Sequence, residues 1–501
     1  MSHQNTSEVD VVVVGGGPGG STAATFVAMQ GHRVVLLEKQ RMPTYKIGES
    51  LLPATVHGIC NLLGVSQAMK DANFVKKLGG TFRWGKSPEP WTFLFAASPK
   101  MIGPTSTAYQ VERMKFDMIL LNNAKDKGVD VREQHSVTGL IDEDGRVAGI
   151  NFTDEQGQPG SIRARYVVDA SGYNTPLARY AGERVYSKFF QNLALFGYYH
   201  DAGRMPAPAQ GNIFCAAFDH GWFWFIPLSD KLTSVGAVVG KELASKLTAG
   251  YEPAMNEFIQ NCPPIRDLLA KATRVTEGPY GELRVRKDYS YCNTKFWKPG
   301  LILIGDSACF IDPVFSSGVH LATYSALLAA RSINTCLVNG LDEERCLAEF
   351  EARYRREYAN FYDFLLAFYD MEGDLDTYFW QARKVLNSPE VGNRAFIDLV
   401  GGVSSSGESL YADTKEFLSE RHGLGEVLFP QASGDATAAQ SNEKRRSDFY
   451  TNLLGEIVQV RSQASLKDRR PMEQPLFPGG LVATPDGLHW MDPALVAAVA
   501  Q

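Results

Sequence analysis

The chain has 501 residues, is 44% hydrophobic, and carries 50 basic and 56 acidic residues for a formal net charge of −6. This length is enough for two or three domains with a substantial core, and the acidic balance disfavours nucleic-acid binding, which depends on a basic surface. The seven cysteines are scattered, with no CxxC or Cys/His cluster, so we expect a reducing compartment and no metal site.

The first ten residues are polar and lead directly into an apolar run, without the charged and hydrophobic regions of a signal peptide. No stretch of about eighteen uninterrupted apolar residues follows, as a membrane-spanning helix would need. We therefore expect a cytoplasmic protein that has neither a membrane nor a nucleic acid as a partner.

The apolar run at 11–14 predicts a strand that is buried on both faces of a parallel sheet. It is followed by GGGPGG, by helical spacing over 21–31, and by a second apolar run over 34–37 that ends at Glu38. We interpret this order as a βαβ unit.

Three glycines of this unit, Gly15, Gly17 and Gly20, fit the GxGxxG pattern of dinucleotide-binding folds. The first allows a tight turn, the second lets the backbone approach a pyrophosphate, and the third allows close helix–strand packing, while the helix N-terminus attracts phosphate. Glu38 can accept hydrogen bonds from the adenosine ribose hydroxyls. A glycine turn that binds no nucleotide is the alternative, but the strand, the helix and the acid together favour a dinucleotide.

Hydrophobic runs alternate with polar turns over 108–171, which predicts a β-meander laid over the nucleotide domain. Residues 185–295 indicate further mixed strands rich in aromatic residues, and 301–308 returns to the nucleotide sheet before a helix that begins near Val319. After residue 340, apolar and aromatic residues at spacings of three and four predict helices.

These elements predict an α/β protein in three parts. A Rossmann-like nucleotide-binding domain takes residues 1–180 and 296–335 and contains the inserted meander. A mixed β-sheet domain that faces the substrate takes 181–295, and a mostly helical region takes 336–501, including a second helical stretch at 447–466.

The aromatic residues of the first C-terminal helix exceed what one helix stripe ordinarily buries. We expect part of them to cover a substrate entrance, with core packing against the sheet as the alternative. They are Tyr354, Tyr358, Phe361, Tyr362, Phe364 and Phe368.

Six segments in order give the most specific indication of function. They are GGGPGG (15–20), KIGESLLPATVHG (46–58), KKLGGTFRWG (76–85), QVERMKFD (110–117), GWFWFIP (221–227) and GDSACFIDPVFSSGVHLA (305–322). This ordered set, over about residues 8–390, resembles the flavin-dependent halogenases of the FAD-dependent aromatic hydroxylase superfamily, and within them the branch that acts on phenol or pyrrole rings. GWFWFIP matches the WxWxIP pattern that halogenases have and flavin hydroxylases lack.

The resemblance implies that the dinucleotide is FAD. Arg113 matches the arginine that touches the flavin, and Asp306 matches an acid near the ribityl chain and pyrophosphate; for Arg113 a surface salt bridge is the alternative. Glu49 belongs to a segment that resembles the strap between flavin and substrate sites, and it is a candidate for coupling to the halide or the flavin. A hydrogen bond to the backbone is its other reading.

The relay lysine of the family lies in an FxxKxG pattern, which this chain matches from Phe74 to Gly79, so the resemblance assigns the role to Lys77. A lysine suits this role because its ammonium can polarise hypohalous acid, its amine can form a haloamine, and burial can tune its pKa. If the segment is a strand, the neighbouring Lys76 points to the opposite face.

Ser317 and Gly318 match the turn whose backbone N–H groups hold halide beside the flavin in the family, where small residues are needed because the backbone is the ligand. A tight turn before the helix is the alternative. Two residues earlier, Phe315 stands where tryptophan halogenases have a glutamate that accepts the ring proton. A phenol is activated by its own oxygen, so this departure favours a phenol over free tryptophan.

The family's chemistry implies that reduced FAD from a separate flavin reductase, together with oxygen, converts chloride or bromide to hypohalous acid, which Lys77 relays to the ring. The implied substrate is a phenolic or tyrosyl ring, often held on an acyl or peptidyl carrier protein in natural-product biosynthesis. Two alternatives stay open: an FAD-dependent aromatic hydroxylase, and a flavin-loaded protein without catalysis that docks in an assembly line.

Overall fold

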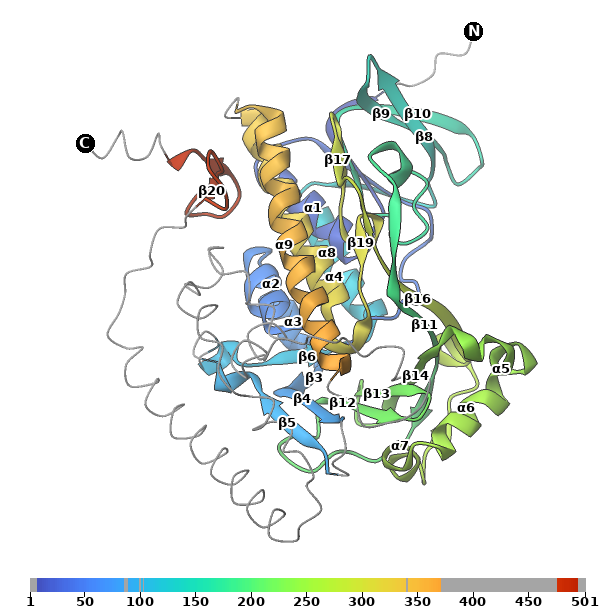
Figure 1. Cartoon of the computed structure of the whole chain (residues 1–501). Coiled ribbons are helices and arrows are strands. Elements are labelled where there is room, and N and C mark those ends of the chain that lie inside the picture. Colours follow the sequence, from blue (N-terminus) through green and yellow to red (C-terminus); the bar gives the residue numbers. More distant parts are fainter. Residues whose placement is uncertain are drawn as a thin grey trace, which may run out of the picture.

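The computed structural model describes residues 7–84, 89–98, 101, 103–338, 341–370 and 475–493, and these residues form the predicted α/β fold (Figure 1). The helices are α1 Pro18–Ala28, α2 Cys60–Leu62, α3 Ser66–Asp71, α4 Arg113–Asp126, α5 Ala244–Ala249, α6 Tyr251–Gln260, α7 Pro263–Leu268, α8 Ser317–Val338 and α9 Glu343–Asp370. The strands are β1 Ser7–Val14, β2 Val34–Glu38, β3 Val75–Lys77, β4 Gly79–Arg83, β5 Trp91–Leu94, β6 Ala108–Gln110, β7 Asp130–Glu133, β8 Ser136–Glu143, β9 Arg146–Thr153, β10 Pro159–Asp169, β11 Arg184–His200, β12 Ile213–Phe218, β13 Gly221–Pro227, β14 Leu232–Gly240, β15 Thr273–Arg274, β16 Arg284–Asn293, β17 Trp297–Lys298, β18 Leu301–Leu303, β19 Cys309–Phe310, β20 Val482–Ala483 and β21 Trp490–Met491.

The nucleotide sheet runs in the order β17-β18-β10-β1-β2-β7. Its central strands are parallel, and β1 lies between β10 and β2 with Val11 opposite both Tyr166 and Val34. The apolar runs of β1 and β2 are buried because neighbours cover both faces of the sheet. The predicted meander is present as β8, β9 and β10, in which β9 pairs antiparallel with β8 on one side and with β10 on the other (Figure 1).

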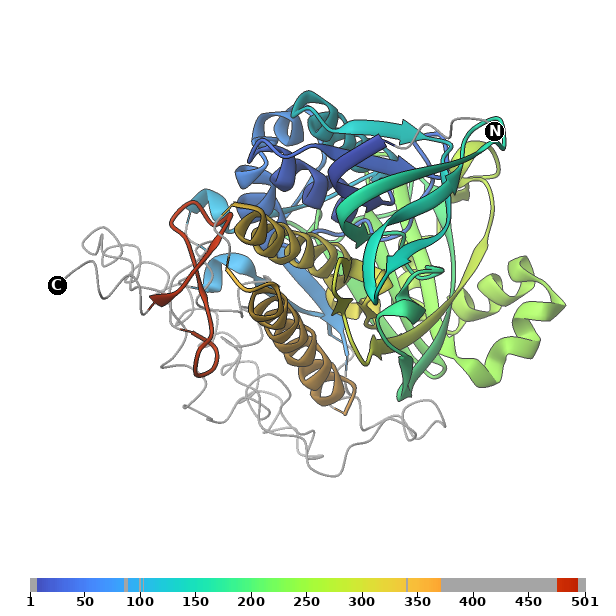
Figure 2. The same ribbon diagram turned by 90° about the horizontal axis from the view of Figure 1, so that it is seen from above.

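Helix α1 lies against β1, β2 and β10 of this sheet and also contacts α4 and α8. α8 in turn packs against α9, so the two long helices lie side by side (Figure 2). The apolar positions of α9 recur at spacings of three and four, and one stripe of them is buried. The described aromatic residues of α9 mostly pack in the core. This is the alternative to the expectation that they cover a substrate entrance. The buried stripe is Leu347, Phe350, Tyr354, Tyr358, Phe361, Leu365 and Phe368, and the Phe364 side chain lies outside the described residues.

The second sheet runs in the order β19-β16-β11-β14-β13-β12-β4-β5, with β15 attached to β11. Its inner core includes Leu195, Phe223 and Val235, which pack with Met255 and Phe258 of α6. The sheet extends beyond the 181–295 boundary expected from the sequence. Because β4 pairs in parallel with β12 and β5 pairs with β4, these two strands, which were placed with the nucleotide domain, join this sheet, as does β19 at its other edge.

Four helices stand where the sequence predicted strands. α4 follows β6 inside the segment interpreted as a meander, and α5, α6 and α7 lie within the 185–295 stretch. The helix expected from Val319 begins two residues earlier, at Ser317, and it continues past residue 335 to Val338.

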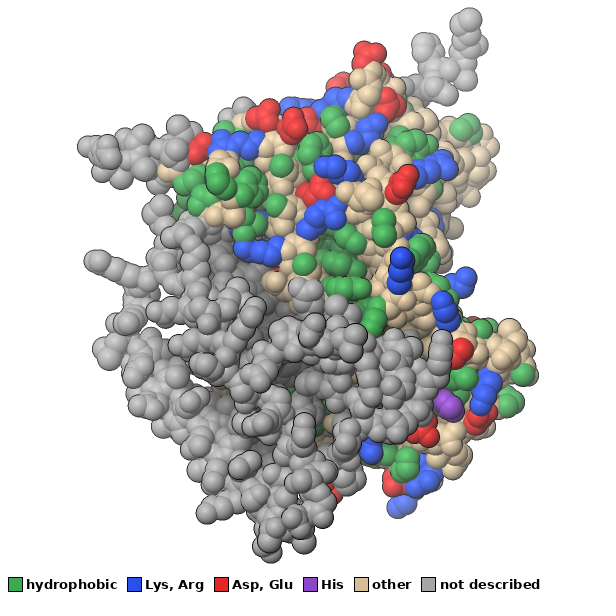
Figure 3. Space-filling view, in the orientation of Figure 1, with side chains coloured by type: hydrophobic (Ala, Val, Ile, Leu, Met, Phe, Trp, Pro, Cys, Tyr) green, Lys and Arg blue, Asp and Glu red, His purple; other side chains and the backbone are tan. Residues whose placement is uncertain are grey.

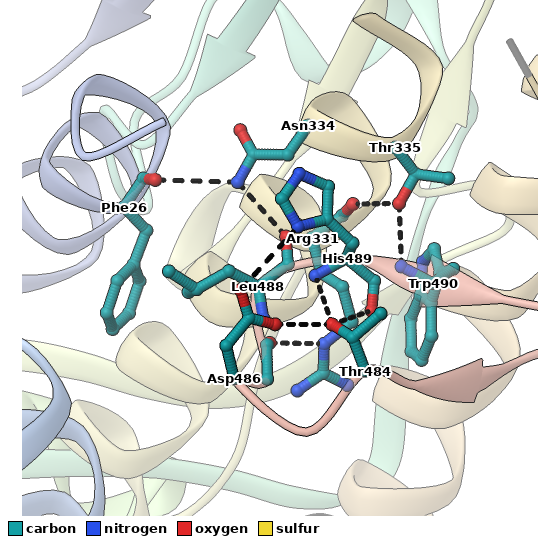
Figure 4. A network of polar contacts seen from close by, with 10 residues as sticks. Phe26, Arg331, Asn334, Thr335, Thr484, Asp486, Leu488, His489 and Trp490 are labelled. Carbon is teal, nitrogen blue, oxygen red and sulfur yellow. Dashed lines mark hydrogen bonds and ion pairs between the residues drawn. The ribbon is translucent and has the colours of Figure 1, made fainter. Parts of the chain in front are cut away.

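Beyond α9, the described residues of the C-terminal region form a two-stranded hairpin of β20 and β21 rather than helix. Residues 447–466, predicted helical, lie outside the described residues. The hairpin is held against α8 by buried polar contacts, in which Asn334 donates to both Phe26 O and Leu488 O, and Thr335 accepts from Trp490 N (Figure 4).

Charged side chains of both signs are interspersed over the described surface seen in Figure 3, as the small net charge of −6 suggests. None of the described helices is both long and apolar enough to cross a membrane.

Candidate functional site

The glycine turn after β1 has the packing that the sequence predicted. Gly15 has φ +107°, and a Cβ there would lie 2.5 Å from Ala170 O; a Cβ at Gly20 would lie 1.9 Å from Gly15 O. Only glycine fits at these two positions. A Cβ at Gly17, by contrast, would meet no other described atom within 4 Å, so the backbone at the N-terminus of α1 is open to a ligand.

Glu38 closes the other side of this turn. It ends β2, and its carboxylate accepts from Gly16 N at 2.8 Å and from Gln40 N at 2.9 Å. The acid is therefore fixed at the carboxyl edge of the parallel sheet, where nucleotides bind in folds of this type.

The same edge brings Asp169 and Asp306 together with the turn. Asp169 ends β10 opposite Val14, and Ile304 N donates to Asp169 O at 3.0 Å. Asp306 follows β18, and burial raises its pKa to about 6, against the opposing effect of Arg113 and Arg184. Two distant segments, 167–172 and 305–308, thus meet beside the glycine turn.

Arg113 is buried at the first turn of α4 and is no surface salt bridge. Its guanidinium donates to both carboxylate oxygens of Asp117, at 2.8 and 3.0 Å, and to the carbonyl oxygen of Ile47. It therefore holds the beginning of the strap, which we define as residues 47–51.

Lys77 lies at the other end of the strap. It is the last residue of β3 and is 2% exposed, while Lys76 is exposed on the opposite face, as strand alternation predicted. Lys77 Nζ donates to Ser50 Oγ at 2.9 Å and to Leu51 O at 3.0 Å. Burial lowers the pKa of Lys77 to about 7, with a small opposing effect of Cys215, so the amine is neutral much of the time at physiological pH.

Between these two contacts, Glu49 turns its side chain toward the second sheet. It is 2% exposed, and its Oε1 accepts from Tyr198 Oη at 2.6 Å; its side chain bonds a tyrosine rather than the backbone. Oε2 makes no hydrogen bond of standard geometry among the described residues. Burial raises the pKa of Glu49 to about 7.

The predicted halide turn lies close to the strap. Asp312 caps the short 3-10 turn Pro313–Phe315 by accepting from Val314 N, and α8 then begins at Ser317. The Ser317 hydroxyl is buried and has no hydrogen bond to any described residue, and a Cβ at Gly318 would meet no described atom within 4 Å. A Cβ at Gly48 of the strap would lie 3.8 Å from the Val319 side chain.

An aromatic cluster, which the sequence did not predict as a unit, joins the segment that follows Lys77 to the residue that precedes this turn. Phe368 of α9 has its ring centroid 4.9 Å from Phe315, 5.2 Å from Phe82 and 4.6 Å from Trp84. Phe82 and Trp84 follow Lys77 along the chain, and Phe315 precedes Ser317. The cluster therefore brings residues near both predicted functional groups into one buried apolar region.

Two of the described histidines, His57 and His320, have structural partners. His57 Nε2 lies 2.8 Å from Thr107 O, and His320 Nε2 lies 2.8 Å from Glu357 Oε1. No group of three or more His, Cys, Asp or Glu side chains within the described residues could hold a metal ion.

Comparison with known proteins gives matches over most of the chain. A family model described as tryptophan halogenase matches residues 10–104 and 96–432. A tryptophan 2-halogenase of Chondromyces crocatus is 34% identical over 430 residues, which are 83% of this chain and 80% of that protein.

Two solved structures are similar in fold and in sequence. The myxobacterial chondrochloren halogenase CndH, described as a variant of FAD-dependent halogenases, is 51% identical with a TM-score of 0.77, over 97% of this chain and 100% of that one. The flavin-dependent halogenase CmlS is 34% identical with a TM-score of 0.71, over 77% of this chain and 69% of that one.

Proposed function

The chain belongs to the tryptophan halogenase family and is an FAD-dependent halogenase, and from this premise we propose that it adds chlorine or bromine to a phenolic ring through Lys77. The observation that supports this role is the buried amine of Lys77, which the strap connects to Arg113. The strap thus contacts both Arg113, which we assign to the flavin side, and Lys77, which we assign to the substrate side.

The described residues fit FAD. The backbone at Gly17 is open where a pyrophosphate would lie on the N-terminus of α1. Glu38 lies at the end of β2, where its carboxylate can accept hydrogen bonds from a ribose. The buried Ser317 hydroxyl and the open backbone at Gly318 provide small polar groups for the flavin and for chloride or bromide. When bound, FAD supplies electrons with which oxygen is activated to oxidise the halide.

Lys77 suits the relay for two physical reasons. Its hydrogen bonds to Ser50 and Leu51 fix Nζ in one place, and burial keeps a large fraction of the amine neutral. A neutral amine has a free lone pair for an electrophilic halogen, and the ammonium form can polarise hypohalous acid by donating a hydrogen bond.

The test compares Lys77→Ala with Lys76→Ala in the purified enzyme, given reduced FAD, oxygen and chloride. We expect Lys77→Ala to lose at least a hundredfold in chlorinated product, measured by mass spectrometry, while it still reoxidises reduced FAD. Lys76→Ala, on the exposed face of the same strand, should retain activity within twofold. Equal activity of the two variants would contradict the assignment.

We further propose that the ring is a tyrosyl or similar phenol bound to an acyl or peptidyl carrier protein, and that a separate flavin reductase supplies the reduced FAD in the cytoplasm. Phe315 supports a phenol because it places an aromatic ring, packed on Phe368, where a carboxylate would serve an indole. A carrier would raise the effective concentration of a weakly bound ring.

Competition among three substrates tests this substrate class: a tyrosyl carrier thioester, a free phenol and free tryptophan. We expect chlorination of the carrier-bound ring to be fastest and that of tryptophan to be undetectable by mass spectrometry. Efficient chlorination of tryptophan, without chlorination of either phenol, would contradict the proposed substrate class but not the halogenase activity.

A further inference from the structure

Three oxygen-bearing side chains form a line from the strap toward the surface. Tyr198 Oη donates to Glu49 Oε1 at 2.6 Å and lies 2.7 Å from Tyr45 Oη. Because the Tyr198 proton is directed to the carboxylate, Tyr45 is the donor in the second bond, so both hydrogen bonds point inward. Glu49 and Tyr198 are buried, whereas Tyr45 is half-buried.

The inner end of this line lies at the centre of the candidate site. Glu49 lies in the middle of the strap. On its N-terminal side, the carbonyl oxygens of Ile47 and Gly48 accept hydrogen bonds from Arg113. On its C-terminal side, Ser50 Oγ and Leu51 O accept hydrogen bonds from Lys77. The second oxygen of its carboxyl group makes no hydrogen bond of standard geometry among the described residues. That oxygen keeps the capacity to accept a further hydrogen bond, beside the interaction of the carboxyl group with the Ser234 hydroxyl.

Halogenation as proposed above consumes a proton. Reduced FAD gives two electrons and two protons, and replacing ring hydrogen by chloride gives two electrons and one proton; reducing oxygen to two waters takes four of each. The balance is FADH2 + O2 + Cl⁻ + H⁺ + Ar–H → FAD + Ar–Cl + 2 H2O. The C–H and O–O bonds break, the C–Cl bond forms, and one proton must enter the buried site with each halide.

We propose that Tyr45, Tyr198 and Glu49 form the path by which this proton enters. This inference rests on the proposed function, because the halogenation balance creates the need for the proton. Glu49 delivers its proton inward and is reprotonated through Tyr198 from Tyr45, and the delivered proton ends in one of the two waters.

The surroundings of Glu49 suit a group that gains and loses a proton. Burial is the main cause that raises its pKa to about 7, and Glu112 acts in the same direction. The hydroxyls of Tyr198 and Ser234 and the guanidinium of Arg113 act in the opposite direction. The pKa of the carboxyl group therefore lies near neutral pH, because burial raises it and groups on β11, β14 and α4 oppose this effect.

The two tyrosines remain neutral and can pass a proton without becoming ions. Burial and the nearby Glu49 raise the pKa of Tyr45 and of Tyr198, with an opposing effect of Arg284 and Arg286 on Tyr45. The Arg284 guanidinium lies 4.0 Å from the centre of the Tyr45 ring, at the partly exposed end of the line.

Tyr198→Phe tests the path because it removes the central hydroxyl and keeps the ring. Tyr280→Phe is the matched control: its ring packs 4.4 Å from that of Tyr198, but its hydroxyl donates to Glu112, outside the line. Halogenation rate is measured from pH 6 to 9 with chemically reduced FAD, chloride and a phenol, in H2O and in D2O. FAD affinity is measured on the same samples.

We expect Tyr198→Phe to slow halogenation at least tenfold at pH 8, less at pH 6, and to show an increased solvent isotope effect, with FAD affinity unchanged. Tyr45→Phe should behave in the same way, and Tyr280→Phe should stay within twofold of the wild type at every pH. If Tyr198→Phe and Tyr45→Phe both had the same pH profile and the same isotope effect as the wild type, the proposed path would be wrong. Absence of halogenated product from the wild type would instead overturn the proposed function.

Discussion

Burial brings an acid and a base to the same pKa at the centre of this site. Glu49 and Lys77 contact adjacent parts of the strap, and loss of hydration disfavours the charged form of each, so both pKa values lie at about 7. An amine that accepts a halogen acts in its neutral form, and an acid that delivers a proton acts in its protonated form. Both forms are well populated together only near neutral pH.

The glycine turn separates residues needed for binding from residues needed for folding. Gly17 has φ −72°, which any residue can adopt, and a Cβ built there would meet no described atom within 4 Å. We therefore expect Gly17→Val to fold normally but to weaken FAD binding more than tenfold, because the side chain would occupy the pyrophosphate position. Fluorescence titration with FAD and thermal unfolding measure the two effects.

Gly20→Val is the control for this prediction. Its Cβ would overlap the carbonyl oxygen of Gly15, so it should lower the unfolding temperature as well as FAD affinity. If Gly17→Val bound FAD as tightly as the wild type, the pyrophosphate would lie elsewhere.

Local sequence patterns concern single side chains of the candidate site and not the contacts between them. Lys77 and Lys76 were assigned to opposite faces from strand alternation alone, and the structure confirms this. The contact of Tyr45 with Tyr198 joins residues 153 positions apart. No local pattern marks such a pair, because it forms only when the strap packs against β11.

At the scale of elements, buried charge explains why α4, one of the four helices in segments predicted as strands, was missed from the sequence. The buried residues of α4 recur with helical spacing, but two of them are Arg113 and Asp117, which satisfy each other as an ion pair. A pattern based on hydrophobicity counts these positions as polar and so loses the periodicity. The others are Phe116, Leu120, Leu121 and Ala124.

The extent of the second sheet depends on pairing that local sequence does not encode. β4 joins β12 in parallel, with Thr81 opposite Phe214, and the two strands are far apart in the chain. The βαβ unit, in contrast, was predicted because its strand, turn, helix and strand follow one another directly. Local order therefore predicted the nucleotide fold, whereas long-range pairing decided the boundary of the substrate-facing sheet.

At the scale of the whole molecule, the C-terminal hairpin supports α8, the helix that begins at the proposed halide turn. α8 begins at Ser317 and Gly318, and its last turns hold the hairpin through Ser332, Asn334 and Thr335. The same Asn334 binds the backbone of α1, so one side chain links the hairpin to the helix that follows the glycine turn. The hairpin thus stabilises both helices whose N-termini form the site.

Trp490 is the residue on which this docking depends. It is 1% exposed, and its indole nitrogen donates to Ser332 Oγ at 2.8 Å. The guanidinium groups of Arg331 and Arg353 lie 4.5 and 5.1 Å from its ring centre. Removing the ring leaves a cavity and takes the aromatic surface away from two arginines.

We expect Trp490→Ala to destabilise the docked hairpin by about 3 kcal/mol, the usual scale for deleting a buried aromatic side chain. Thermal unfolding should begin several degrees lower, and brief proteolysis analysed by mass spectrometry should cut within 475–493 faster than in the wild type. The matched control is Met491→Ala, on the same strand but only partly buried, which should change both measurements much less. Equal protease resistance of Trp490→Ala and wild type would mean that the hairpin does not depend on this contact, and that it is held instead from α9, where Arg345 and Arg353 donate to Gly479 O and Leu481 O.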